Sequence, residues 1–111
     1  MNPRNVGEIA DADGVGSAGD PACGDFMKVW LKVEGVHIAD IKYKCRGCPP
    51  AIAAASAMSE IAIGMNIDTA SELTDETIAE AIGGLSPDKM HCSNLAAAAL
   101  YEAIMNWALK M

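Results

Sequence analysis

The chain has 111 residues, which is enough for one small domain with a modest core and too few for two. Hydrophobic residues make up 51% of the chain and charged residues 21%, a balance that excludes intrinsic disorder. Eight Lys and Arg residues stand against 15 Asp and Glu residues, a formal net charge of −7 without a basic tract, so we expect no binding to nucleic acid.

The first half of the chain favours strands. Residues 1–25 hold five glycines and few large apolar side chains, so we interpret them as a loop, with residues 1–20 flexible. Residues 26–34 alternate between apolar and polar side chains and predict a half-buried strand, with Trp30 on its outer face. A tight turn at Gly35 leads to a returning strand over 36–45, whose alternation slips near Ile38 and indicates a bulge there. Because two strands alone are marginal, we expect a third from the glycine-rich start.

The hydrophobic period then changes to that of helices. Two prolines begin a predicted helix over 51–63, and Gly64 ends it. Thr69 and Glu72 resemble a capping box for one short helical turn.

Two further helices complete the pattern. Thr74 is placed to cap a helix over 75–82, and the longest helix is predicted over 94–110. The apolar stripe of that last helix comprises Leu95, Leu100, Ile104, Trp107 and Ala108. Strands followed by helices predict an α+β fold, in which a small antiparallel sheet of about three strands is packed by helices in a single domain over 1–111.

Four cysteines need an explanation in such a chain. No run of 18 apolar residues exists, and residues 1–10 lack the basic and apolar regions of a signal peptide, so we expect a cytoplasmic protein with no membrane contact. In that compartment, cysteines are expected to be thiols or ligands of a metal or cluster rather than disulfides.

Three of the cysteines fall at the ends of predicted elements. Cys23 directly precedes the first predicted strand, Cys48 precedes a helix start, and Cys92 follows His91 near the start of the last helix. Free N–H groups and the helix dipole favour a thiolate at a helix start. Asp25 adds an oxygen ligand near these thiols, and a mixed donor set favours a site that dissociates easily.

Each residue also has a plain structural interpretation. Cys23 could be a loop thiol, Cys48 a small residue at a turn, and Cys92 a buried helix cysteine. His91 could be an exposed or capping histidine, and Asp25 could cap a local turn. Cys45 forms a C-x-x-C pair with Cys48, but its strand register places it on the face of Tyr43, which favours core packing.

Several segments together resemble the IscU/NifU N-terminal-domain family of iron–sulfur cluster assembly scaffold proteins. They are Asn2-Pro3-Arg4-Asn5-Val6-Gly7, Pro21-Ala22-Cys23-Gly24-Asp25, Gly47-Cys48 and Lys89-Met90-His91-Cys92-Ser93. Their order and approximate spacing match the family across almost the whole chain. Leu85-Ser86-Pro87-Asp88-Lys89 departs from the Leu-Pro-Pro-Val-Lys loop by which some relatives dock a chaperone.

The resemblance implies a specific function. Cys23, Cys48 and Cys92 would bind the cluster, with Cys92 as the acceptor of persulfide sulfur, Asp25 as the carboxylate that keeps the cluster labile, and His91 as an additional ligand. The chain would then be a scaffold rather than an enzyme. It would take sulfur from a cysteine desulfurase, iron, and electrons from a donor such as a ferredoxin, and build a 2Fe-2S cluster for recipient apo-proteins.

Two other functions use the same residues. One is a zinc-dependent sulfur acceptor that partners a cysteine desulfurase, and the other is a zinc-stabilised interaction module without sulfur chemistry. Zinc takes the same thiolate ligands as a cluster, so zinc in place of the cluster would not separate these functions. A homodimer could bridge two sites and supply extra ligands.

Overall fold

The computed structural model describes residues 6–20, 25–46, 49–81, 83 and 90–109, and this part of the chain forms a three-stranded antiparallel sheet and four helices. The strands lie in the order β1-β2-β3 and comprise β1 (Gly14–Asp20), β2 (Asp25–Glu34) and β3 (His37–Arg46). The helices are α1 (Pro49–Ala62), α2 (Ile67–Ser71), α3 (Asp75–Ala81) and α4 (Met90–Leu109). The predicted α+β fold with a small antiparallel sheet is confirmed.

The hairpin of β2 and β3 contains the predicted bulge. Val33 pairs with Ile38 but Lys32 pairs with Asp40, so Ala39 has no partner on β2. The extra residue turns Ala39 outward and brings Ile38 onto the same buried face as Ile41. This is why the hydrophobic alternation of the sequence slips at this point.

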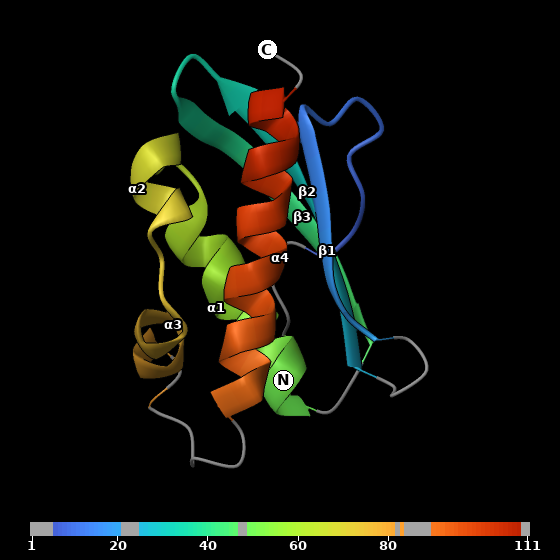
Figure 1. The fold of residues 1–111 in the computed structure, drawn as a ribbon, viewed down its shortest axis with the longest axis vertical. Coiled ribbons are helices and arrows are strands. Elements are labelled where there is room, and N and C mark those ends of the chain that lie inside the picture. Colours follow the sequence, from blue (N-terminus) through green and yellow to red (C-terminus); the bar gives the residue numbers. More distant parts are fainter. Residues whose placement is uncertain (1–5, 21–24, 47–48, 82, 84–89, 110–111) are drawn as a thin grey trace.

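The glycine-rich start supplies the third strand, as expected, but its interpretation as a loop is wrong for residues 14–20, which pair with β2 along their whole length. Residues 6–13 cross the outer side of the sheet (Figure 1) and are attached by ion pairs from Lys44 to Glu8 at 2.9 Å and from Lys32 to Asp11 at 3.2 Å. Trp30 lies on this outer face as predicted; it is 8% exposed, and the Lys28 ammonium lies 5.2 Å from its ring. The flexibility of residues 1–20 stays a prediction.

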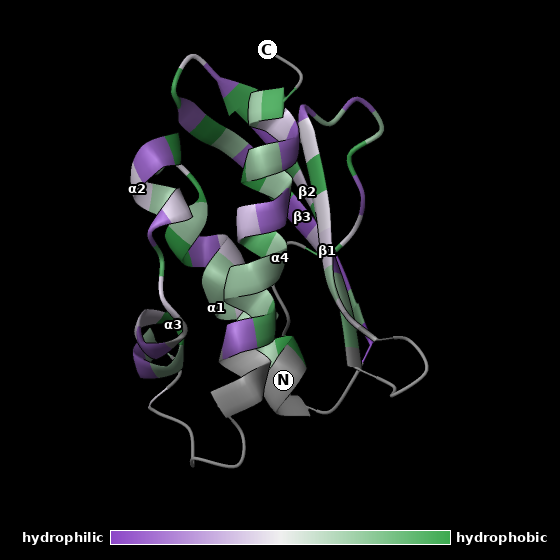
Figure 2. Cartoon of the chain, in the orientation of Figure 1, coloured by the Kyte–Doolittle hydropathy of each residue, from purple (hydrophilic) through white to green (hydrophobic). Residues whose placement is uncertain are grey.

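The helices cover the other face of the sheet (Figure 1). α1 packs on β3, α4 packs on β1 and β2, and α3 packs against both helices. Green, hydrophobic residues recur where these layers meet (Figure 2). The largest fully buried apolar side chains are Met27, Val29, Leu31, Ile38, Ile41, Tyr43, Met58, Ile78 and Leu100. Among the described helices, none combines the length and the hydropathy needed to cross a bilayer.

The helix ends agree with the sequence in part. The Thr74 hydroxyl accepts a hydrogen bond from the Thr77 amide at 3.2 Å, so the predicted cap of α3 is confirmed. The capping box at Thr69 is wrong: Thr69 lies inside α2, and the Asn66 side chain caps that helix by accepting from the Asp68 amide at 2.9 Å.

The last helix differs from its prediction at its start and in its buried stripe. α4 begins at Met90, four residues before the predicted start at Asn94, because its first turn includes polar residues that carry no hydrophobic period. Ala108 was expected on the buried stripe but is exposed. The buried side of α4 is instead formed mainly by Ala96, Ala99, Leu100, Ala103 and Ile104.

Candidate functional site

The ends of the three strands that flank the predicted ligands lie together. Asp25 begins β2 and pairs with Asp20, the last residue of β1. Phe26 pairs with Arg46, so the end of β3 lies beside the start of β2. Cys23 and Cys48 are outside the described residues, but the strand ends on either side of residues 21–24 and before residues 47–48 meet at one end of the sheet.

Two glycines of β1 determine how α4 lies on the sheet. A Cβ added at Gly16 would be 2.1 Å from the Ala103 backbone nitrogen and 2.7 Å from the Ala99 carbonyl oxygen, and one added at Gly14 would be 2.3 Å from the Ala103 carbonyl oxygen. The missing side chains therefore allow the helix backbone to touch the strand. Gly14 also faces Trp107 whereas Gly16 faces Ala99, so β1 and α4 run in opposite directions.

This antiparallel contact determines where the first turn of α4 lies along the length of β1. Asp20 lies four residues beyond Gly16, about 13 Å along the strand at ~3.3 Å per residue. About nine helical residues at ~1.5 Å each cover the same distance. Counting back nine residues from the contact at Ala99 to Ala103 leads to the first turn, which contains His91 and Cys92. Figure 1 shows the starts of α1 and α4 at the same lower end as the end of β1 and the start of β2.

The backbone of the candidate ligands can thus be placed in part. Asp25 begins a strand, and His91 and Cys92 lie in the first helical turn, where up to four N–H groups lack a partner within the helix. The structure describes the backbone but not the side chains of these three residues. Among the side chains that it does describe, no three of His, Cys, Asp or Glu gather to hold a metal ion.

Cys45 lies next to this end of the sheet but belongs to the core. It pairs with Met27 across the sheet, and its half-buried side chain packs against the hydrophobic cluster. The predicted core packing of Cys45 is confirmed.

The neighbouring Tyr43 hydroxyl is buried and poorly satisfied. Burial raises the pKa of Tyr43; the nearby Ser56 hydroxyl lowers it in part, and the charges of Cys45 and Glu60 raise it further. Ser56 lies close to the phenol oxygen, but no described atom forms a hydrogen bond of good geometry with it.

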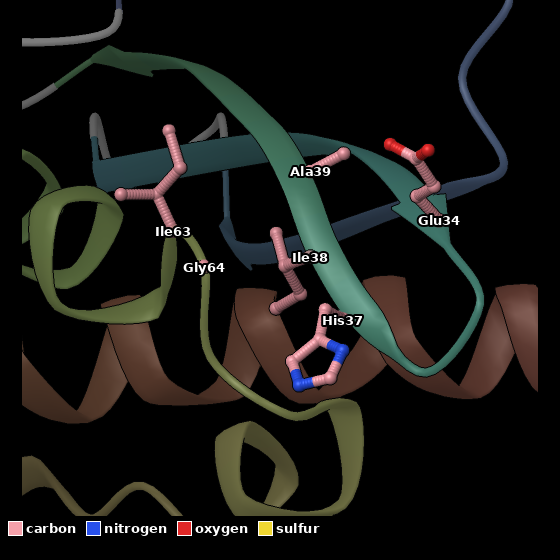
Figure 3. A pocket seen from close by; sticks show the side chains of 6 residues that line it. All are labelled: Glu34, His37, Ile38, Ala39, Ile63 and Gly64. Carbon is pink, nitrogen blue, oxygen red and sulfur yellow. The ribbon is translucent and has the colours of Figure 1, made fainter.

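A hollow lies at the other end of the molecule. It has a volume of about 500 Å³ and lies between the turn of β2 and β3 and the end of α1. In Figure 3 the imidazole of His37 points toward α2 while the carboxylate of Glu34 points away from it, on the far side of the strand. Since these two groups do not converge, we do not consider this hollow a ligand site, and the candidate site remains the end of the sheet that lies beside the first turn of α4.

Sequence reasoning singled out the ligands but missed the residues that position them. The glycine-rich start is interpreted as a loop that also supplies a third strand, with no contact assigned to Gly14 and Gly16. The alternation of these two glycines, together with an alanine-rich helix, is the signal that could have identified the contact. That contact determines where the backbone of Cys92 lies, along the strand direction, relative to the backbone of Asp25.

Comparison with known proteins agrees with this architecture. A family model described as the NifU-like N terminal domain matches residues 1–111. An iron–sulfur cluster assembly scaffold protein IscU from Archaeoglobus fulgidus is 52% identical over 110 residues, which cover 99% of this chain and 72% of the relative. The scaffold protein IscU of Aquifex aeolicus is 46% identical over 112 residues, which cover 99% of this chain and 71% of the relative.

Solved structures share the fold. A putative iron–sulfur cluster assembly scaffold protein for the SUF system from Fervidobacterium islandicum superposes with a TM-score of 0.74 at 22% identity, covering 91% of this chain and 87% of that one. The N-terminal part of a NifU-like protein from Brucella abortus gives a TM-score of 0.73 at 19% identity, with 99% and 89% coverage.

Proposed function

The chain belongs to the family of NifU-like N-terminal domains, and on that premise we propose that it is a scaffold on which a labile 2Fe-2S cluster is assembled and then passed to recipient apo-proteins. The relatives named as iron–sulfur cluster assembly scaffold proteins support the scaffold role. The observation that carries the proposal is the meeting of the described strand ends with the first turn of α4 at one end of the molecule. In this role the cluster is cargo, and the chain turns over no small substrate.

The sulfur step uses the position of Cys92. We propose that a cysteine desulfurase presents a persulfide and that the Cys92 thiolate attacks its outer sulfur. One S–S bond forms on Cys92, the S–S bond of the donor breaks, and the donor leaves as a thiolate. The backbone N–H groups of the first helical turn and the helix dipole favour the thiolate that makes this attack.

Cluster formation then needs iron and electrons. Each persulfide sulfur takes up two electrons to become sulfide, and a donor such as a ferredoxin supplies them. The thiolates of Cys23, Cys48 and Cys92 are the soft ligands that iron–sulfur clusters require. Asp25 and His91 complete the donor set, and the harder carboxylate makes the site easier to leave.

Anaerobic reconstitution tests this proposal. With ferrous iron, cysteine and a cognate desulfurase, the chain should acquire the visible absorption of a 2Fe-2S centre together with equal amounts of iron and sulfide. Cys92→Ser should abolish assembly, whereas the matched variant Cys45→Ser should leave it nearly intact, because Cys45 packs in the core. A wild-type chain that accepts sulfur only when loaded with zinc, and forms no cluster, would instead identify a zinc-dependent sulfur acceptor.

A further inference from the structure

A groove runs between the edge of the sheet and α4, along the half of the helix that is farther from the predicted ligands. Its volume is about 250 Å³. β1 forms one wall, because it is the edge strand of the sheet, and the C-terminal half of α4 overhangs it. Figure 1 shows α4 lying alongside β1.

The edge of β1 offers backbone groups to this groove. The Val15 amide donates to the Asn106 side-chain oxygen at 3.0 Å, so it points away from β2. Because N–H groups alternate in direction along a strand, the N–H and C=O of Ser17 point the same way. Ser17 is exposed, and no described side chain bonds to its backbone. The Val15 amide is therefore already paired with Asn106, and the part of this edge at Ser17 is the template for another strand.

The two sides of the groove differ in chemistry. On the helix side, Met105 and Leu109 are apolar yet 39% and 81% exposed, and the polar residues Glu102 and Asn106 line the groove beside them. On the outer side of the sheet, Lys28 lies opposite Ser17 with its ammonium 5.2 Å from the Trp30 ring. Within the described ranges, Lys28 has no carboxylate at ion-pair distance. Side chains of an added strand would alternate between these two sides.

We propose that this groove binds an extended segment of another protein, which joins β1 as a fourth strand. Its apolar side chains face Met105 and Leu109, and carboxylates at the alternate positions face Lys28. A second copy of β1 does not fit, because paired strands lie about 4.8 Å apart whereas the two copies of α4 above them need ~8–10 Å. The proposal does not rest on the cluster role, and a strand bound in this groove would leave the first turn of α4 accessible.

A synthetic peptide of four Val-Glu repeats, blocked at both ends, tests the proposal. Titrated into the isotope-labelled chain, it should give saturable NMR shift changes at Val15, Ser17, Met105 and Leu109. Two further peptides carry N-methyl groups on either all valines or all glutamates. Since alternate amides of a strand face opposite edges, one of these peptides should bind and the other should not. Equal behaviour of the two, changes confined to other residues, or no saturation up to about 1 mM peptide would overturn the proposal.

Matched variants distinguish binding in this groove from non-specific binding. Lys28→Gln should weaken binding about two- to fivefold, whereas Lys42→Gln, on the same face but over β3, should leave it unchanged. Leu109→Ser should weaken binding about tenfold, whereas Val36→Ser, 53% exposed at the turn of β2 and β3, should not. Equal effects within either pair would contradict the groove, and so would concentration-dependent broadening of the β1 signals without peptide, which would indicate self-association.

Discussion

Replacing Gly16 by alanine should destabilise the protein through a clash that no side chain can relieve. The new Cβ would lie 2.1 Å from the Ala103 nitrogen, 2.6 Å from the Glu102 carbonyl carbon and 2.7 Å from the Ala99 oxygen. All three atoms are helix backbone. Ordinary contact begins at 3.4 Å, so α4 must retreat by 3.4 − 2.1 = 1.3 Å from the strand.

The change in the free energy of unfolding depends on two opposing contributions, the steric clash and the reduced entropy of the unfolded chain. Overpacking typically costs about 1–3 kcal/mol, and a rigid neighbour places this site at or above the upper end. A glycine-to-alanine change at a compatible backbone would instead stabilise by about 0.4–1 kcal/mol, and Gly16 has no positive φ to oppose it. The steric term should win, with a loss of about 3 kcal/mol from a total of ~5–15 kcal/mol.

Urea unfolding followed by circular dichroism measures this loss, with Ser17→Ala, an exposed change on the same strand, as the control. The Gly16→Ala variant should also assemble cluster more slowly, because retreat of α4 moves the backbone of Cys92 away from Asp25. A variant as stable as the wild type, or more stable, would refute the close contact of strand and helix and the level of Cys92 derived from it.

Three other changes test separate parts of the argument. Asp25→Ala should slow transfer of the cluster to an apo-ferredoxin, measured by the rate at which the acceptor gains its spectrum; faster transfer would reject Asp25 as the labile ligand. Tyr43→Phe should leave the free energy of unfolding unchanged or raise it slightly, because the buried hydroxyl lacks a good hydrogen bond; a loss of more than about 1 kcal/mol would show that the hydroxyl is satisfied. Hydrogen bonds and charge attraction from their lysine partners lower the pKa values of Glu8 and Asp11. A lowered folded-state pKa contributes stability above the unfolded-state pKa, and this stability is lost as pH falls through the folded-state pKa. The protection factors of amides in residues 6–13, that is, their exchange rates corrected for the intrinsic rate at each pH, should therefore fall under acid and not near neutral pH.

The sequence predicted most reliably the elements whose side chains alternate or repeat. The period of two in residues 26–34 identified β2, and the slip near Ile38 identified the bulge at Ala39. The strand β1 carries almost no such signal, since glycine has no side chain to bury. Its pairing depends on contacts with β2 and α4, which come from distant parts of the chain.

The orientation of α4 was harder to predict for a related reason. Alanine occurs on several of its sides, so hydrophobicity alone does not distinguish Ala103, which is buried, from Ala108, which is exposed. Gly14 and Gly16 decide between these sides, because only the side that meets them can approach the sheet closely.

The candidate ligands pose the opposite problem. Cys23 and Cys48 fall where elements join, and such positions follow no period, so residue type and resemblance identified them before any geometry did.

The location of the core also separates a scaffold from a domain that zinc holds together. The buried cluster runs without interruption from β2 and β3 through α1 to α4, and its described members are apolar side chains such as Leu31, Met58 and Leu100. We expect a fold stabilised in this way to persist without metal, whereas a zinc-dependent module loses its structure when the metal is removed. Chelation followed by dialysis should therefore leave the far-ultraviolet circular dichroism and the cooperativity of urea unfolding unchanged. If the metal-free chain instead unfolded without a cooperative transition, the metal would be structural. The same residues could then not serve as a scaffold site, because a scaffold must stay folded after it releases its cluster.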